Sequence, residues 1–474
     1  MKQFKPVLIS AIVLLIVAVS AFVVIKMFDN AGGEPPAPFV SGELEVIRIM
    51  DCDEHEVTSI EIIGKDESWC IDYKFTDDGV EAAMRNADPR LVYDEFEMTT
   101  LPTFLCTLSA IEEIGEGEDA DFGFDNPRRK IRINFKDGTA KTLLIGDDLP
   151  VEDGLYVKVD GEATVYAVGE TTEERIMQAR KEFLSANLFP AIAKTSDLTW
   201  VEYTEAGKKT VSISLRSEAD ITRDSSRMGM PVSYAMTAPV NALTNPRTID
   251  EKFFDKVIAI EGIRVVEELP RDLAKYGLKN PSKLKLKTNT GIAASILIGG
   301  KSENGGSYVM PEGVPMVIET LAPVGLEEFD YKQIMLELLF FYNSTEVKSI
   351  DYTLPTGKTH TLTIELEDYL VRGSLDGKKL EGRNAGNLFQ RTICLTAAGE
   401  LEGGFAYGNP DIKITANLND GSRHTMLLYK ANERQYAAEV DGKRNNFYVS
   451  VTEVDDILEA FELLEKGENI PDMF

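Results

Sequence analysis

An internal repeat constrains the fold of this chain more than any other feature of its sequence. Three segments share one pattern, in which Asn-Pro is followed by an alternating strand, a Gly-containing turn and a second strand. They read FGFDNPRRKIRINFKDGTAKTLLIG from Phe122, KYGLKNPSKLKLKTNTGIAASILIG from Lys275, and FAYGNPDIKITANLNDGSRHTMLLY from Phe405. A repeated supersecondary unit predicts tandem copies of one module.

The repeated motif has a local structural explanation. Proline fixes φ and cannot donate a hydrogen bond to a ladder, so it suits the start of a strand. Asparagine is a common turn residue. The motif residues are Gly123, Asn126 and Pro127 in the first copy, Gly277, Asn280 and Pro281 in the second, and Gly408, Asn409 and Pro410 in the third. We predict that these residues are structural and not catalytic.

The residues after each proline alternate between apolar and polar side chains, which indicates half-buried strands. The apolar positions are Ile131, Ile133 and Phe135, then Leu284 and Leu286, then Ile412 and Ile414. The turns are predicted at Asp137-Gly138, Thr290-Gly291 and Asp420-Gly421. A tyrosine follows each proline by 29, 27 or 26 residues, at Tyr156, Tyr308 and Tyr436, and we predict equivalent structural positions for the three.

A second landmark has matching spacing. Strands are predicted to open the modules at Val57, Ser196 and Val347, and they precede the motif asparagines by 66, 82 and 59 residues, counted from Ile60, Leu198 and Ile350. The longer middle copy contains an insertion over roughly residues 223–245, which we interpret as an irregular loop.

Helices are predicted within and between the copies. The ranges are 101–114, 248–260 and 384–397 within the modules, 172–187 and 327–342 between them, and 454–465 at the end. Antiparallel strands with a few helices indicate an α+β fold. The prediction is three tandem β-rich modules, at residues 46–190, 191–342 and 343–474, after one N-terminal transmembrane helix.

The N-terminus predicts a membrane anchor. Residues 7–25 are apolar except for Ser10 and Ser20, and as a helix they span roughly 28 Å, close to the thickness of a bilayer's hydrocarbon core. We predict a cytoplasmic tail at 1–6, a transmembrane segment at 7–26 and a linker at 27–45. Lys2 and Lys5 place the tail in the cytoplasm and the bulk of the chain outside it, in a single-pass protein of the cell membrane. A cleaved signal peptide with a site at Ala18-Val19-Ser20 is the main alternative.

Charge and cysteine content narrow the function classes. A net charge of −29 argues against a nucleic-acid partner, which requires basic patches, and is typical of an exposed soluble domain. The four cysteines, Cys52, Cys70, Cys106 and Cys394, form no CxxC pair. Cys52 and Cys70 flank one predicted hairpin, so a disulfide between them stays open, and Cys394 is interpreted as a small core residue.

No catalytic signature is present in the sequence, which contains no GxSxG, Walker A or HExxH motif. The three histidines, His55, His360 and His424, are interpreted as surface strand or turn residues. Asp51, Asp53 and His55 are weak metal candidates if they alternate along one strand face, and a solvated acidic edge is the favoured reading. Trp69 and Trp200 are interpreted as packing residues, with sugar stacking as the alternative. No cofactor is predicted.

The motif residues resemble those of the bacterial domain-of-unknown-function 4340 family. The similarity rests on the anchor, the opening hairpin, the aromatic-Gly-Leu-x-Asn-Pro element, a strand ending in Leu-Ile-Gly and a Tyr-Val strand. Residues 276–281 (YGLKNP) match this element well, residues 122–127 (FGFDNP) replace its Leu by Phe, and the third copy is one residue shorter. The resemblance covers most of residues 57–465 and supplies no catalytic residue.

The resemblance implies an accessory role beside an ABC-type export permease and its gliding-motility-type auxiliary subunit. We therefore expect a non-enzymatic extracytoplasmic accessory or scaffold protein of a membrane transport complex. The alternatives are a cell-surface ligand- or cell-wall-binding module, with a pocket formed by the insertion at 223–245, and a hydrolase. The wall-binding module predicts a concave pocket, and the hydrolase predicts a cleft containing a group with a strongly shifted pKa.

Overall fold

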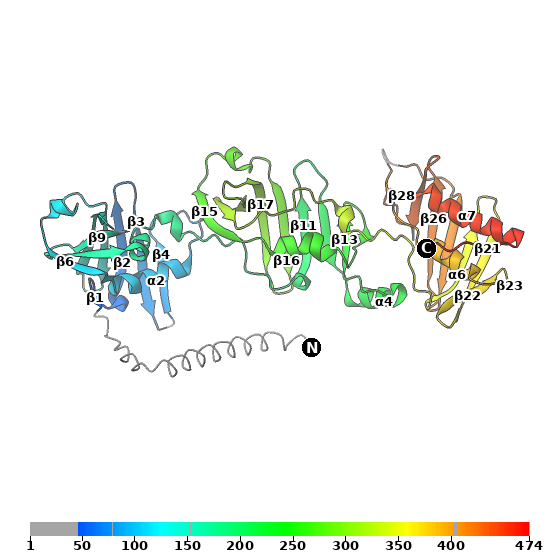
Figure 1. Cartoon of the computed structure of the whole chain (residues 1–474), viewed down its shortest axis with the longest axis horizontal. Helices are drawn as coiled ribbons and strands as arrows, with labels where there is room; N and C mark the ends of the chain where they lie inside the picture. Colours follow the sequence, from blue (N-terminus) through cyan, green and yellow to red (C-terminus); the bar gives the residue numbers. More distant parts are fainter. Residues whose placement is uncertain (1–45, 78, 152, 402–404, 474) are drawn as a thin grey trace, which may run out of the picture. The chain divides into compact units, whose positions relative to one another are not determined.

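The structure of the chain is a computed structural model that describes residues 46–77, 79–151, 153–401 and 405–473 (Figure 1). The described chain divides into two compact units, one with residues up to Cys70 and 101–177, the other with 71–100 and 178–473. The predicted tail, anchor and linker at 1–45 lie outside the described residues. Among the residues described, no helix is long and apolar enough to cross a membrane.

Antiparallel sheets with a few helices make up the described chain, which confirms the α+β class. In the first unit six neighbouring strands follow the order β2 (Val57–Gly64), β7 (Arg129–Phe135), β8 (Ala140–Asp148), β9 (Gly154–Val159), β10 (Thr164–Gly169) and β6 (Glu112–Glu116). The strands β1 (Ile47–Arg48) and β5 (Ser109–Ala110) form a separate pair. The boundary between the units falls within β3 (Ser68–Thr76), which pairs with β4 (Gly79–Met84) in a hairpin.

The second unit contains two nine-stranded sheets. The first of them has the order β14 (Ala242–Leu243), β13 (Tyr234–Ala238), β12 (Val211–Leu215), β11 (Leu198–Thr204), β16 (Ser282–Thr288), β17 (Ala293–Lys301), β18 (Ser307–Pro311), β19 (Met316–Thr320) and β15 (Gly262–Glu268). The other has the order β23 (Lys378–Lys379), β22 (Leu370–Leu375), β21 (Thr359–Glu367), β20 (Val347–Thr353), β25 (Ile412–Leu418), β26 (Arg423–Lys430), β27 (Gln435–Val440), β28 (Phe447–Ser450) and β24 (Gly399–Glu400).

The three sheets share one topology. In each, the predicted opening strand (β2, β11 or β20) pairs with the strand after Asn-Pro (β7, β16 or β25), and three further strands follow in chain order. Another strand (β6, β15 or β24) closes the sheet by pairing with the last of these. The closing strands were not predicted, because β6 and β24 are mainly polar and β15 contains three charged residues.

Two apolar layers cover the second sheet, one on each face. On one face Phe253 and Val257, from the π-helical turn η5 (Asp250–Phe254) and the helix α5 (Asp255–Ile258), pack against the strands. On the other face the motif loop brings Tyr276 and Leu278 against Val317. Since successive strand residues point to opposite faces, one strand contributes to both layers.

The glycine of the Leu-Ile-Gly segment allows the motif loop to pack closely against this second face. A Cβ atom at Gly299 would lie 2.2 Å from the Tyr276 carbonyl oxygen, and one at Gly146 would lie 2.1 Å from that of Phe122. Only glycine permits such an approach of the two backbones. The motif aromatics then pack edge-on against the predicted tyrosines, with ring centroids 4.9 Å apart for Phe122–Tyr156 and for Tyr276–Tyr308.

In the third copy an aromatic contact replaces the close approach of the loop to a strand glycine. Tyr429 occupies the position of the strand glycine, and Phe405 and Tyr407 pack against its ring at 6.2 and 5.1 Å. Gly123 and Gly277 have φ values of 80° and 70°, whereas Gly408 has no positive φ. The shorter third motif therefore follows a different backbone path.

The predicted tyrosine of the third copy is wrong by one residue. In the first two sheets the isoleucine of Leu-Ile-Gly pairs with a valine on the next strand, Val157 or Val309. The predicted tyrosine is the residue immediately before that valine. The corresponding partner in the third sheet is Ala438, so the equivalent position is Ala437. Tyr436 faces the main core instead, because a shift of one residue moves a side chain to the opposite face of a sheet.

Three predicted helices are present near their expected ranges. The range 248–260 contains η5 and α5, the range 384–397 contains α6 (Asn384–Ile393), and the C-terminal range contains α7 (Val451–Lys466). The helix predicted at 101–114 is α2 (Glu95–Cys106), which Asp94 caps by accepting from the Glu97 N–H at 3.1 Å. Residues 109–114 enter β5 and β6 instead.

The helices predicted between the copies are mostly wrong. Residues 172–187 contain α3 (Glu170–Ile176) and the 3-10 helix η3 (Arg180–Phe183), whereas 327–342 contain only the 3-10 helix η7 (Tyr331–Ile334). Tertiary hydrogen bonds override the helical periodicity there, since Leu336 N–H donates to Leu243 and Leu339 N–H to Leu395. This segment is therefore extended between the second and third sheets.

The insertion at 223–245 is more regular than predicted. It contains most of α4 (Glu218–Met228) near its start and the strands β13 and β14 near its end. Ser217 caps α4 by accepting from the Asp220 N–H at 3.2 Å, and Gly229 ends it with a φ of 69°. These cap residues are helix signals that the loop interpretation overlooked.

The close approach of the motif loop can be tested at two adjacent glycines of β17. We expect Gly299→Ala to lower the free energy of unfolding by about 1–3 kcal/mol, since the added methyl group overlaps the Tyr276 carbonyl. Gly300→Ala is the matched control, because its Cβ would lie 3.7 Å from the same oxygen. Urea denaturation measures both, and equal midpoints for the two variants would contradict the assignment.

Candidate functional site

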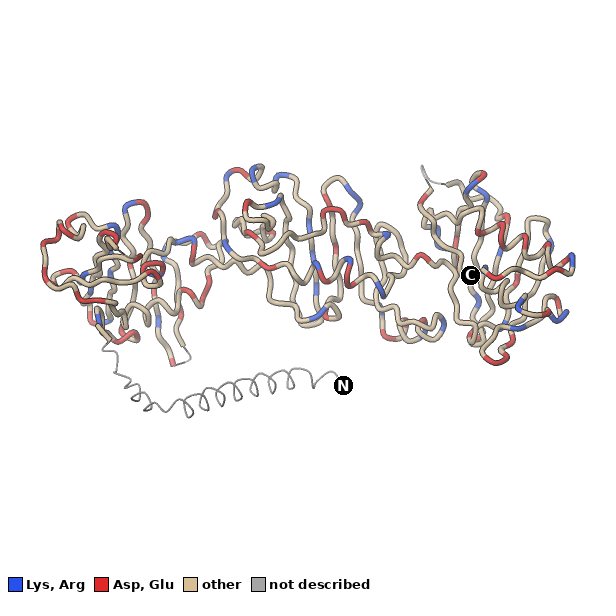
Figure 2. The backbone as a smooth tube through the Cα atoms, in the orientation of Figure 1, with Lys and Arg blue, Asp and Glu red and all other residues tan. Residues whose placement is uncertain are grey.

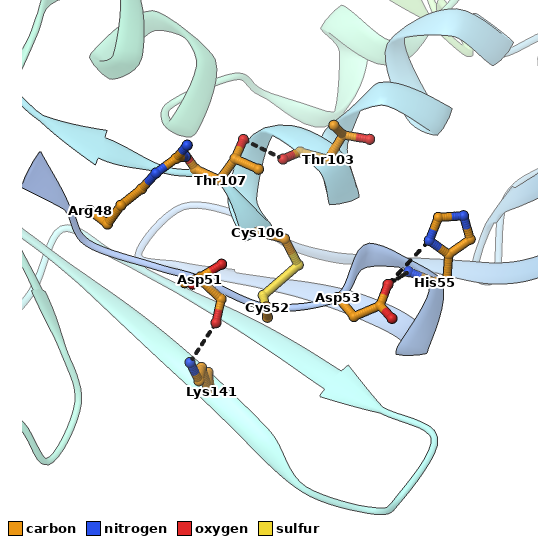
Figure 3. Close-up of a disulfide and its surroundings, with 9 residues drawn as sticks. All are labelled: Arg48, Asp51, Cys52, Asp53, His55, Thr103, Cys106, Thr107 and Lys141. Carbon is orange, nitrogen blue, oxygen red and sulfur yellow. Dashed lines mark hydrogen bonds and ion pairs between the residues drawn. A yellow bond between two sulfur atoms is a disulfide. The ribbon is translucent and has the colours of Figure 1, made fainter. Parts of the chain in front are cut away.

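The weak metal candidates Asp51, Asp53 and His55 do not share a strand face. The 3-10 helix η1 (Glu54–Glu56) is capped by Asp53, which accepts from the His55 N–H at 2.9 Å. The Asp53 carboxylate also lies 3.1 Å from the His55 ring, and Lys141 donates to the Asp51 carbonyl (Figure 3). The expected strand is not formed here, because the 3-10 helix prevents the side chains of these three residues from alternating along one strand. Nowhere in the described ranges do three or more His, Cys, Asp or Glu residues group to hold a metal.

The disulfide is Cys52–Cys106, and the pairing of Cys52 with Cys70 is wrong (Figure 3). The Cys52 N–H donates to the carbonyl of Cys106 at 3.2 Å, so the two backbones meet where α2 ends, with Cα atoms 4.8 Å apart. Cys70 is a buried thiol, and Cys394 is partly buried. The partners lie 54 residues apart in the sequence, so spacing alone did not reveal them.

His360 and His424 occupy matching positions on their hairpins. Their Nδ1 atoms lie 2.7 Å from the carboxylates of Asp376 and Asp441, and each carboxylate also accepts from the backbone N–H that follows the histidine. Both side chains are partly buried, so the prediction of surface residues is only partly right. Their recurrence indicates a structural role shared by both, and His424 has further contacts of its own.

The tryptophans do not form an open stacking surface. Trp69 is buried, and Trp200 is half-buried, with its indole N–H donating to Ser212 at 3.1 Å. Lys287 lies over the Trp200 ring, 5.6 Å from the centroid. This arrangement favours packing over sugar binding.

A cavity of about 470 Å³ lies within the second unit, where the insertion meets the third sheet. One wall is polar and comes mainly from α4 and from the end of β12: Arg216, Asp220, Arg223, Asp224 and Arg227. A second group of lining residues is apolar and comes from β14, the extended linker and β27–β28: Leu243, Leu336, Leu338, Leu339, Phe341, Val440 and Phe447. The lining includes no Ser or Cys beside His424, so it offers no side-chain nucleophile of that kind.

Arg227, near the end of α4, links the insertion to the third sheet. Its guanidinium donates to Asp420 at 2.7 Å and to Ser422 at 3.1 Å, and it lies 3.3 Å from Nε2 of His424. The carbonyl of Arg227 accepts from the Asn343 N–H at 2.6 Å. Four residues distant in sequence therefore converge on one arginine, whose side chain is only 15% exposed.

Hydrogen bonds account for the lowered pKa values of the two carboxyl groups near Arg227. Hydrogen bonds from Ser422 and Arg227 hold the pKa of Asp420 well below its ordinary value. Burial by itself would raise the pKa of Asp441, but hydrogen bonds from His424 and a backbone N–H outweigh it and lower this pKa. Because a depressed carboxyl pKa contributes stability that is lost only as pH falls through it, these contacts persist at neutral pH.

The other cations of the polar wall are also paired. Arg216 bonds to Asp224, and Arg223 reaches Asp220 at 2.7 Å and Asp224 at 3.2 Å. The cavity therefore combines an apolar wall with a wall of neutralised charges. Such a surface suits a contact between elements or an amphipathic small molecule more than a strongly charged ligand.

The family description "Domain of unknown function (DUF4340)" matches residues 94–251 and 235–380, well over half of the chain. The chain belongs to the DUF4340 family. Comparisons with curated proteins and with solved structures gave no match.

The two DUF4340 matches begin within sheets and not at their edges. The first starts at Asp94, the cap of α2, and reaches the beginning of the second sheet's helix, while the second runs from β13 to the end of β23. Each match thus combines the later strands of one sheet with the opening strands of the next. The third Asn-Pro motif at 409–410 lies beyond both matches, in agreement with its different packing.

The cavity residues of this DUF4340 protein were only partly foreseen. The insertion was proposed as a pocket wall, and it contributes Arg223 and Arg227. The sequence did not reveal that His424 lines the cavity or that Asp420 and Ser422 bind Arg227, because these three residues lie in an ordinary hairpin. The one available signal was the Ser217 cap before an acidic turn, which marks a helix able to carry contact residues.

The disulfide can be checked by peptide mapping of the native, unreduced protein. We expect one linked peptide that contains Cys52 and Cys106, and alkylation of Cys70 and Cys394 after denaturation. Reduction should separate the linked peptide. A linked peptide containing Cys52 and Cys70 would contradict the structure.

Arg227 can be tested against Arg223, its neighbour on α4. Arg227→Ala removes hydrogen bonds to the third sheet, whereas both acidic partners of Arg223 lie on α4 itself. Hydrogen bonds to charged groups are each worth about 1.5–3 kcal/mol. We therefore expect cleavage in α4 and residues 335–346 by a limiting protease to become about tenfold faster in Arg227→Ala. Equal acceleration in Arg223→Ala would refute this linking role.

Proposed function

We propose that this chain is a membrane-anchored, non-enzymatic accessory or scaffold protein that acts outside the cytoplasm in an ABC-type transport complex. The observation that carries the proposal is that the repeated residues have structural roles, whereas a connection that varies between the copies makes the contact. The residues that the copies share support loop packing, and the connection that differs most between them carries the contact helix α4. A scaffold of repeats with variable contact elements suits protein interaction.

The repeat itself supports the structural half of the proposal. We infer that the third sheet is a third, diverged copy of the module, since it repeats the strand order of the other two. The modules then have the predicted bounds 46–190, 191–342 and 343–474. Divergence of the Asn-Pro loop explains why the family matches stop at residue 380.

The proposed location rests on three features. The apolar run at 7–25 is long enough to cross a bilayer, Lys2 and Lys5 precede it, and a disulfide is compatible with an oxidising compartment. Acidic residues spread over all the sheets, as Figure 2 shows, and they suit an exposed soluble domain. The transport partner comes from the family resemblance.

Ligand binding is the second candidate, and the cavity beside α4 is the observation that favours it. Its two walls differ in polarity, as a small amphipathic ligand requires. Hydrolysis has less support. Burial and Asp148 raise the pKa of Glu173, but this residue lies on α3, outside the cavity.

Affinity purification from gently solubilised membranes tests the proposal. With a C-terminal tag on the full chain, we expect an ABC-type permease or its auxiliary subunit to co-purify in stoichiometric amount, as mass spectrometry would show. A chain that emerges alone while it retains cell-wall fragments would replace the accessory role with the binding module. An unrelated single-pass membrane protein with the same C-terminal tag serves as the control.

A further inference from the structure

The hairpin β21–β22 extends beyond the rest of the third sheet. β21 pairs with β20 from Thr359 to Thr363, but it pairs with β22 as far as Glu367. Residues 364–367 therefore have a strand neighbour on one side only. Every residue from Glu365 to Leu370 is exposed.

The end of this hairpin exposes three large apolar side chains. Leu366 is 45% exposed, Leu370 is 44% exposed and Tyr369 is fully exposed. Leu366 pairs with Val371, so Leu370 lies on the opposite face of the two-stranded ribbon. An apolar partner must therefore contact both faces of the tip, which a pocket does and a flat surface does not.

Tyr369 also occupies an unfavourable backbone conformation. Asp368 and Tyr369 have φ values of 49° and 63°, which suit Asn-Gly in a two-residue hairpin turn. A bulky side chain in this region is uncommon and costs conformational energy. No contact within the described chain offsets this cost, since the ring is fully exposed.

Acidic side chains surround the apolar tip. Glu365, Glu367 and Asp368 are exposed within the same six residues, and the nearest cation, Arg372, lies 3.7 Å from Glu367. An acidic rim around an apolar centre complements a pocket rimmed by Lys and Arg. It disfavours an anionic membrane surface for the same reason.

The same connection in the second sheet already makes a contact. Where β21 and β22 form a hairpin in the third sheet, β12 and β13 are joined by α4, which binds the third sheet through Arg227. In the third sheet no described part of the chain covers the equivalent hairpin tip, since Glu365 to Leu370 are all exposed. The topological position is therefore one that this chain uses for docking.

We propose that the β21–β22 tip, centred on Tyr369 with Leu366 and Leu370, inserts into an apolar, basic-rimmed pocket of a partner protein. The inference rests on the proposed function only for the identity of that partner.

The test compares full-length tagged chains purified from membranes. We expect Tyr369→Gly to lower recovery of the co-purifying permease or auxiliary subunit by about tenfold, as for an interfacial tyrosine hot spot. Its melting midpoint should stay equal or rise, because glycine relieves the positive φ. Tyr369→Phe should retain the partner. Leu321→Ala, at an apolar residue that is 63% exposed elsewhere in the chain, is the matched control and should also retain it.

Charge reversal and cross-linking complete the test. Glu365→Lys with Glu367→Lys should also lower recovery, and a photo-cross-linking residue at position 369 should label a partner peptide with flanking Lys or Arg. Full recovery with Tyr369→Gly would overturn the inference while leaving the proposed function intact. If the unaltered chain recovers no transport subunit, the proposed function fails. The photo-cross-link at position 369 then decides by itself whether the tip binds a partner protein. A product with lipid, with a second copy of this chain, or no product would then overturn the inference.

Discussion

The close approach of the Asn-Pro loop to a strand glycine organises each of the first two sheets. The absent Cβ at Gly146 and Gly299 lets a loop carbonyl lie against the strand, and the loop aromatic then covers the outer face. With helices on the other face, the central strands are covered on both sides. The third sheet reaches a similar result with Tyr429, whose hydroxyl bonds to Glu439, while Arg444 stacks on Tyr407.

Repetition of one topology leaves the connection that follows β12 and β21 free to vary. It is the two-residue turn Asp368-Tyr369 in the third sheet and the helix α4 in the second. A connection at the end of a hairpin lies outside the core, so its length has little effect on sheet packing. Arg227, which binds the third sheet, and Tyr369, the centre of the proposed docking tip, both lie in this connection.

The predictions succeeded where local chemistry dominates and failed where distant partners decide. The strands after Asn-Pro were correct, because alternation and turn residues are local signals. Residues 335–342 read as a helix, yet their backbone N–H groups bond to Leu243 and Leu395. Tyr436 follows its proline by 26 residues and Tyr308 by 27, and this difference of one residue places the two side chains on opposite faces of their sheets.

The sequence alone determined the repeat, the α+β class and the family, because each depends on residue types at short spacings. It also showed the apolar run at 7–25 that underlies the proposed anchor. Only the tertiary structure decided that Cys52 bonds to Cys106, that Arg227 meets Asp420, and that a cavity forms beside α4. These features join residues from separate elements, and their distance depends on how the sheets pack and not on any local pattern.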